Sequence, residues 1–172
     1  MKKILIATLV AVLALTGSVS LIAAAASVTT PGPVNLIADG GADGEKLDVG
    51  DLTLSYDGTD LTVAFVTNGS GWQMTETHLN VSSSAPTKSA PGKFTYKHEG
   101  LGGIPTDSYT FAQGTGLCYI AAQAEVQLNL GDINDDGVDE YQVETAWAEG
   151  TVIRPGKNWA TYFPVELASP SP

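Results

Sequence analysis

The sequence predicts an all-β protein, built as a single antiparallel β-sandwich of about seven or eight strands. Three observations carry this prediction. From residue 51 onward, apolar and polar residues alternate with a period of two. Turn signals such as Asp57-Gly58 and Asn68-Gly69 separate the alternating runs. No window longer than one turn shows helical periodicity after residue 27.

The expected strands cover residues 52–56, 61–65, 72–82, 94–97, 109–112, 117–130, 141–147 and 159–167. The clearest alternation lies in 117–130. One face of this run is apolar and includes Cys118, while the other face carries Gln123, Glu125, Gln127 and Asn129. This pattern is typical of a half-buried strand with its polar side in water.

Composition and charge exclude several classes of protein. Apolar residues make up 43% of the 172, which is enough for a hydrophobic core and argues against a disordered chain. Nineteen acidic against eight basic residues give a net charge of −11, whereas nucleic-acid recognition needs a basic face. A single cysteine excludes a disulfide scaffold and a cysteine zinc cluster. We therefore expect no nucleic-acid partner.

Residues 1–26 have the pattern of a signal peptide. Lys2 and Lys3 precede a long apolar run, and Ala24 and Ala26 suit a signal peptidase. The alternative is an uncleaved anchor, because residues 4–26 are long enough to cross a bilayer. Cleavage leaves six bases against nineteen acids, a charge of −13, on a secreted or cell-surface protein that is free of the membrane.

The mature chain is expected to form one domain. Residues 27–38 are predicted as a flexible N-terminal segment, because they carry two prolines and no periodicity. The sandwich is expected over 39–168, and 169–172 form a short tail.

The segment 131–140 has the spacing of a calcium loop. Side-chain oxygens recur at Asp132, Asn134 and Asp136, and Gly137 permits a sharp turn after them. The predicted ligands of Ca²⁺ are Asp132, Asn134, Asp136, the Val138 carbonyl and Glu140. Hard oxygen ligands in a loop favour calcium over magnesium, which demands stricter geometry.

This run resembles the DxNxDG calcium loops of EF-hand and dockerin proteins, but Val143 stands where they have a bidentate acid. It resembles more closely the calcium loop between two strands of integrin-type propeller repeats, in which Glu140 would occupy the last side-chain ligand position. The alternative is an acidic hairpin turn without an ion. Six acids and no base within residues 132–144 favour the ion, because unneutralised carboxylates repel one another.

Four other segments resemble an uncharacterised domain family of secreted and surface proteins from bacteria and archaea. They read TETHL, PGKF-x-YKHE, ETAW and GKNWATYF in this chain. The resemblance spans residues 48–167 and implies an extracellular module. It implies no catalytic residue.

Both histidines stand near acids, His78 near Glu76 and His98 beside Glu99. One interpretation is a zinc or hydrolytic site built from Glu76, His78 and His98. The other is a structural network formed by Glu76, His78, Lys97, Glu99 and Glu144. Two histidines without a third ligand motif favour the network.

The tryptophans divide into two groups. Trp147 and Trp159 fall on apolar strand faces and are expected in the core. Trp72 begins a strand beside Gly71 and is the one expected at the surface, where a sugar ring can stack.

The function expected from these features is non-enzymatic, because no serine stands in a nucleophile elbow and Cys118 faces the core. We expect a secreted calcium-binding protein acting in surface adhesion or in matrix or filament assembly. Its partner is expected to be a surface glycan, a protein or another copy of itself. The alternatives are a carbohydrate-binding module and a metal-dependent hydrolase using Glu76 and His78.

Overall fold

The computed structural model describes residues 27–29, 32–39 and 46–169. The predicted signal peptide and residues 170–172 of the tail lie outside this part. The described strands are β1 (Ser27–Thr29), β2 (Val34–Asp39), β3 (Lys46–Tyr56), β4 (Asp60–Thr67), β5 (Trp72–Ser82), β6 (Tyr96–His98), β7 (Thr106–Ala112), β8 (Gly116–Gly131), β9 (Glu140–Ala148), β10 (Thr151–Val152) and β11 (Thr161–Ala168).

The all-β, antiparallel prediction is confirmed. Every strand pairing is antiparallel, and eight of the described strands have six residues or more. The helical structure described is one 3₁₀ turn, Pro91–Lys93. None of the described residues forms a helix long and apolar enough to span a membrane.

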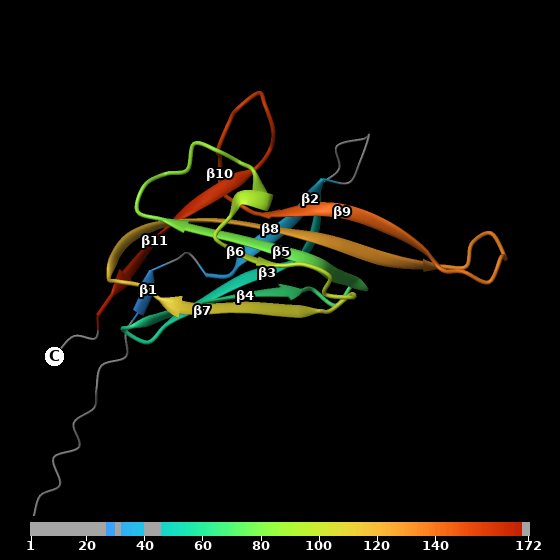
Figure 1. Cartoon of the computed structure of the whole chain (residues 1–172), viewed down its shortest axis with the longest axis horizontal. Coiled ribbons are helices and arrows are strands. Elements are labelled where there is room, and N and C mark those ends of the chain that lie inside the picture. Colours follow the sequence, from blue (N-terminus) through green and yellow to red (C-terminus); the bar gives the residue numbers. More distant parts are fainter. Residues whose placement is uncertain (1–26, 30–31, 40–45, 170–172) are drawn as a thin grey trace, which may run out of the picture.

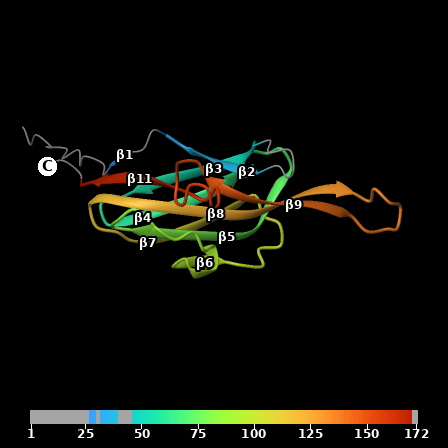
Figure 2. The ribbon, with the colours of Figure 1, turned by 90° about the horizontal axis from the view of Figure 1, so that it is seen from above.

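The strands form one continuous sheet that folds over on itself. Its main path runs β1-β11-β8-β9-β2-β3-β4-β7, and β5 joins the other edge of β8. Figures 1 and 2 show β5, β8, β9 and β11 in one layer and β3, β4 and β7 in the other. The two predicted layers are thus continuous, because β2 pairs with both β9 and β3.

The prediction of a flexible segment over 27–38 is wrong for the strands described within it. Ser27–Thr29 pairs with the end of β11, and Val34–Asp39 lies between β3 and β9. Leu36 and Ala38 are fully buried in the core. The alternation of Val34, Leu36 and Ala38 is only three apolar residues long, and the nearby prolines obscure it in the sequence.

The main core lies between the two layers. It is built mostly from alternate residues of the strands, including Leu52, Phe65, Met74, Ile120 and Val165. Burying this apolar surface is the main favourable term in folding, at roughly 25 cal/mol per Å². Cys118 lies in this core as predicted, and burial, together with the negative charge of Glu166, raises the pKa of its thiol.

A second, smaller cluster covers the outer face of the β5–β8–β9 layer. Phe94, Ala121, Trp147 and Ala160 form it, and Trp159 packs against it. Three of the four segments singled out in the sequence contribute to this cluster: Phe94 lies in PGKF-x-YKHE, Trp147 in ETAW and Trp159 in GKNWATYF. The fourth, TETHL, lies within β5. Gln123 was predicted to face water, but the covering segments bury it.

Candidate metal centre

The predicted calcium loop is the tip of the β8–β9 hairpin, which projects beyond the rest of the sheet (Figures 1 and 2). Strand β5 accompanies β8 only as far as Leu128, and β2 pairs with β9 only at residues 146–148. Beyond these points the two strands pair only with each other, up to the Gly131–Glu140 pair. The loop is therefore held by a two-stranded ribbon.

Three residues of the segment 131–140 adopt the left-handed backbone conformation. They are Gly131 (φ 75°), Asp135 (φ 62°) and Gly137 (φ 86°). Glycine adopts it without a steric penalty, and aspartate is one of the few other residues that tolerate it. The backbone conformation of the loop thus favours aspartate and glycine independently of the predicted calcium ligation.

The loop's own backbone amides orient its side-chain oxygens. Asp132 accepts two of these hydrogen bonds, at 3.0 and 2.7 Å, the first from the Asp136 amide. The same Asp136 amide donates to Asn134 Oδ1 at 3.1 Å. Glu140 Oε2 accepts from the Ile133 amide at 2.8 Å across the loop. These bonds hold the oxygen-bearing side chains over the turn.

Three carboxylates of the predicted ligand set come together. One oxygen each from Asp132, Asp136 and Glu140 lies within 4.8 Å of the other two. Asn134 belongs to the same hydrogen-bonded turn, and Val138 is assigned to the set by its sequence position alone. Asp139, by contrast, accepts a hydrogen bond from Asn129 at 2.8 Å.

No base of the described residues forms an ion pair with these carboxylates. The ion pairs found among the described residues involve His78, His98 and Lys97, all outside the hairpin. Converging anions repel one another, and the repulsion falls when a cation lies between them. Chemically, the loop offers an all-oxygen set suited to a hard divalent cation such as Ca²⁺.

The structure does not bring together Glu76, His78 and His98. Thr77 pairs with His98, and His78 with Lys97, so the two histidines lie on opposite faces of the β5–β6 pair. His98 Nδ1 lies 2.9 Å from both carboxylate oxygens of Asp107, and its ring stacks on Tyr109. The three-residue zinc hypothesis is therefore wrong as stated.

The predicted charged network is correct except for one residue. Glu76 and Glu99 both approach His78, and Lys97 Nζ lies 3.9 Å from Glu99. Glu144 instead accepts a hydrogen bond from Gln142, on the other face of the layer. Sequence reasoning missed Gln123, whose Oε1 lies 2.6 Å from His78 Nδ1. Its place in an alternating polar row gave no sign of this role.

The tryptophan predictions are wrong in one case. Trp72 is 7% exposed and belongs to the main core, so it offers no stacking surface for a sugar. Trp147 is buried and Trp159 is half-buried, both at the second cluster.

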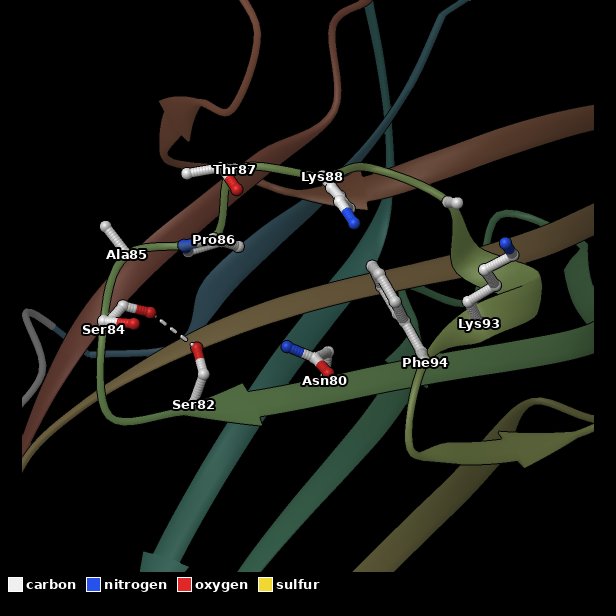
Figure 3. A pocket seen from close by; sticks show the side chains of 10 residues that line it. Asn80, Ser82, Ser84, Ala85, Pro86, Thr87, Lys88, Lys93 and Phe94 are labelled. Atoms are coloured by element: carbon white, nitrogen blue, oxygen red, sulfur yellow. Dashed lines mark hydrogen bonds between the residues drawn. The ribbon is translucent and has the colours of Figure 1, made fainter.

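A pocket of about 350 Å³ lies where residues 83–94 pass over the end of β5 (Figure 3). Asn80 lies on the strand side, Lys88 and Lys93 come from the overlying segment, and Phe94 closes one end. Neither lysine forms an ion pair with any described acid. The sequence signal for this pocket was two lysines within a proline-rich loop, which is too general to be recognised.

Comparison of the chain with protein-family models, with curated proteins and with solved structures finds no match in any of the three. The functional argument therefore rests on the geometry of this molecule.

Proposed function

We propose that this is an exported calcium-binding β-protein whose β8–β9 hairpin mediates association at a cell surface or in an extracellular matrix. The observation that carries the proposal is the convergence of the Asp132, Asp136 and Glu140 carboxylates at the tip of a projecting ribbon. Calcium bound there fixes a loop that otherwise depends on two strands alone.

The surface of the ribbon supports a role in association. Its exposed large apolar side chains are between 44% and 70% accessible, and they are Leu130, Ile133, Val138, Tyr141 and Val143. Clustered exposed apolar residues are typical of interaction surfaces. A protein partner or a second copy of the chain is the proposed occupant, and calcium reduces the charge repulsion that such contacts would meet.

Calcium titration of the mature protein tests the proposal. Extracellular calcium modules bind with Kd values of about 10⁻⁴–10⁻³ M. At ten times Kd, the free energy of unfolding rises by RT ln(1 + [L]/Kd), which is about 1.4 kcal/mol. We expect one ion per chain by calorimetry, a higher Tm in calcium than in EDTA, and a shift to larger species in size-exclusion chromatography.

Two neighbouring substitutions separate ligation from general charge. Asp136→Asn removes a converging carboxylate, whereas Asp135→Asn removes the same charge from a residue outside the convergent set and keeps a side chain that tolerates the left-handed conformation. We expect at least a tenfold loss of calcium affinity for Asp136→Asn and less than threefold for Asp135→Asn. Equal losses, or an unchanged Tm in the wild type, would contradict the calcium site.

A second candidate function is binding of an anionic saccharide in the pocket of Figure 3. It is supported by two lysines, Lys88 and Lys93, that have no acidic partner among the described residues of a chain with net charge −11. The Asn80 amide adds a polar group beside them. The carbohydrate-binding alternative therefore rests on this pocket and no longer on Trp72, which is buried.

Binding of acidic and neutral oligosaccharides tests this second candidate. We expect uronate-containing chains to bind and neutral chains not to bind, with at least tenfold loss in the Lys88→Ala/Lys93→Ala double variant. Lys46→Ala removes a lysine far along the chain from the pocket and serves as the control. Equal binding of neutral and acidic chains would exclude the electrostatic basis.

A further inference from the structure

A second group of metal-ligating side chains lies on the outer face of β5, away from the hairpin tip. His78 Nε2 lies 3.9 Å from Glu76 Oε2 and 3.8 Å from Glu99 Oε1. One ligand atom of each of the three residues lies within 4.8 Å of the other two. Glu76 and His78 are alternate residues of β5, and Glu99 directly follows β6, which pairs with β5.

The buried Gln123 orients the imidazole. The His78 side chain is 6% exposed, and its Nδ1 lies 2.6 Å from Gln123 Oε1. An amide oxygen only accepts hydrogen bonds, so Nδ1 donates to it, and Nε2 is the ring nitrogen that faces the two carboxylates. Metal-bound histidines are held in this way, with the second ring nitrogen donating to an oxygen acceptor.

This arrangement places three ligand atoms around one point. Nε2 lies 3.8–3.9 Å from one oxygen of each carboxylate, and these separations are longer than hydrogen bonds. Glu125 adds a further negative charge directly across from Glu76, where like charges are destabilising. Lys97, 3.9 Å from Glu99, is the only base in contact with these described side chains.

The spacing fits a small divalent cation. Zinc bonds of 2.0–2.2 Å in tetrahedral geometry place two ligands about 3.3–3.6 Å apart, so His78 and each carboxylate need to close by only a few tenths of an ångström. The Glu76 and Glu99 oxygens lie within 4.8 Å of each other and also have to approach. An imidazole nitrogen in the set favours zinc or a related transition metal over calcium, which prefers oxygen ligands alone.

We propose that Glu76, His78 and Glu99 form a binding site for a divalent transition metal ion, zinc in the first instance. His78 is the buried base of the site, while Glu76 and Glu99 are 35% and 59% exposed, so the fourth coordination position faces solvent. Gln123 acts as a positioning residue through His78. The site does not depend on the calcium hairpin, so each can be present without the other.

The two histidines of the chain provide a matched pair of variants. We expect calorimetry to show one Zn²⁺ per wild-type chain, with at least 100-fold loss of affinity in His78→Gln and no change in His98→Gln. Co²⁺ used as a spectroscopic probe should give a visible absorption band in the wild type and in His98→Gln, but not in His78→Gln.

Because His78 is buried, a second variant guards against loss of folding. Glu99→Gln alters an exposed side chain and should lower zinc affinity at least tenfold with an unchanged circular dichroism spectrum. Asp136→Asn changes only the hairpin and should leave zinc binding intact. Absence of zinc binding to the folded wild type, equal loss in the two histidine variants, or loss in Asp136→Asn would each overturn the assignment.

Discussion

The two ends of strand β8 carry the same sequence pattern in different surroundings. From Cys118 to Val126 its inward-facing residues are at most 2% exposed, because β5 and either β11 or β9 flank the strand and the opposite layer covers it. Leu130 lies further along the strand, at a β-bulge between Asn129 and Gly131, and is 44% exposed, because the hairpin has left the body. Alternation therefore predicts which residues share a face, but not where the covering layer ends.

The buried part and the exposed part of β8 therefore have different roles. Within the body, the apolar face contributes to stability. In the ribbon, apolar side chains that no second layer covers are available for contact with other molecules, and the loop at its end gains order from local hydrogen bonds between Asp132, Asn134 and the turn amides. The following experiments test this contrast between the body and the ribbon, beginning with the largest expected effect.

Truncation of apolar side chains along β8 should distinguish its two ends directly. Ile120→Ala leaves a cavity in the main core and should lower the free energy of unfolding by about 2–5 kcal/mol. Leu130→Ala, ten positions further along the strand, should cost less than about 1 kcal/mol. Urea denaturation measures both, and similar losses would show that the ribbon is buried in solution.

A second pair of variants replaces one glycine by alanine in the body and one in the hairpin loop. A Cβ on Gly50 would lie 2.1 Å from the Val66 carbonyl oxygen, so Gly50→Ala forces strands β3 and β4 apart and should cost about 3 kcal/mol or more. Gly137→Ala meets no neighbour and should cost about 1–2 kcal/mol through its left-handed backbone. Thermal unfolding in EDTA compares them, and a larger Tm loss for Gly137→Ala would reverse the contrast.

Amide hydrogen exchange should show the contrast without mutation. Amides of residues 131–140 should exchange quickly in EDTA and about tenfold more slowly at ten times the Kd for calcium, because binding reduces the population of open loops. Amides paired between β5 and β8 should not respond. A calcium effect spread evenly over the sheet would indicate global stabilisation instead of loop ordering.

Thiol reactivity is the mildest probe of the contrast. Burial, reinforced by the charge of Glu166, raises the pKa of the Cys118 thiol, so little thiolate forms at neutral pH. Cys118 should react with a disulfide reagent only after denaturation, whereas the thiol of a Leu130→Cys variant should react in the folded state. Rapid labelling of native Cys118 would show that the body opens.

The sequence allowed prediction of features that are local in the chain. The predicted calcium ligands span nine residues, so the convergence of Asp132, Asp136 and Glu140 follows from loop spacing. The strands β3, β4 and β8 follow from long alternating runs. In contrast, β2 is a short apolar pattern beside prolines, and its burial depends on pairing with β9 more than a hundred residues later.

Long-range contacts explain the other places where the structure differs from the sequence-based predictions. The Glu76–His78–Glu99 group needs β6 to pair with β5, and its imidazole is oriented by Gln123 from β8. Trp72 begins its strand beside a glycine, yet it is buried against the opposite layer. In each case the side chain's environment is created by a segment distant in sequence, which periodicity within one strand does not report.

The length of β8 has a mechanical consequence. This one strand runs from its pairing with β11 near the C-terminus, along β5, to the tip of the hairpin. A pull applied at the tip along the strand axis loads the ladder hydrogen bonds of several neighbours together in shear, since these bonds lie perpendicular to the strands. A tether attached at the hairpin would thus distribute its load over the hydrogen bonds that β8 makes with β5, β9 and β11.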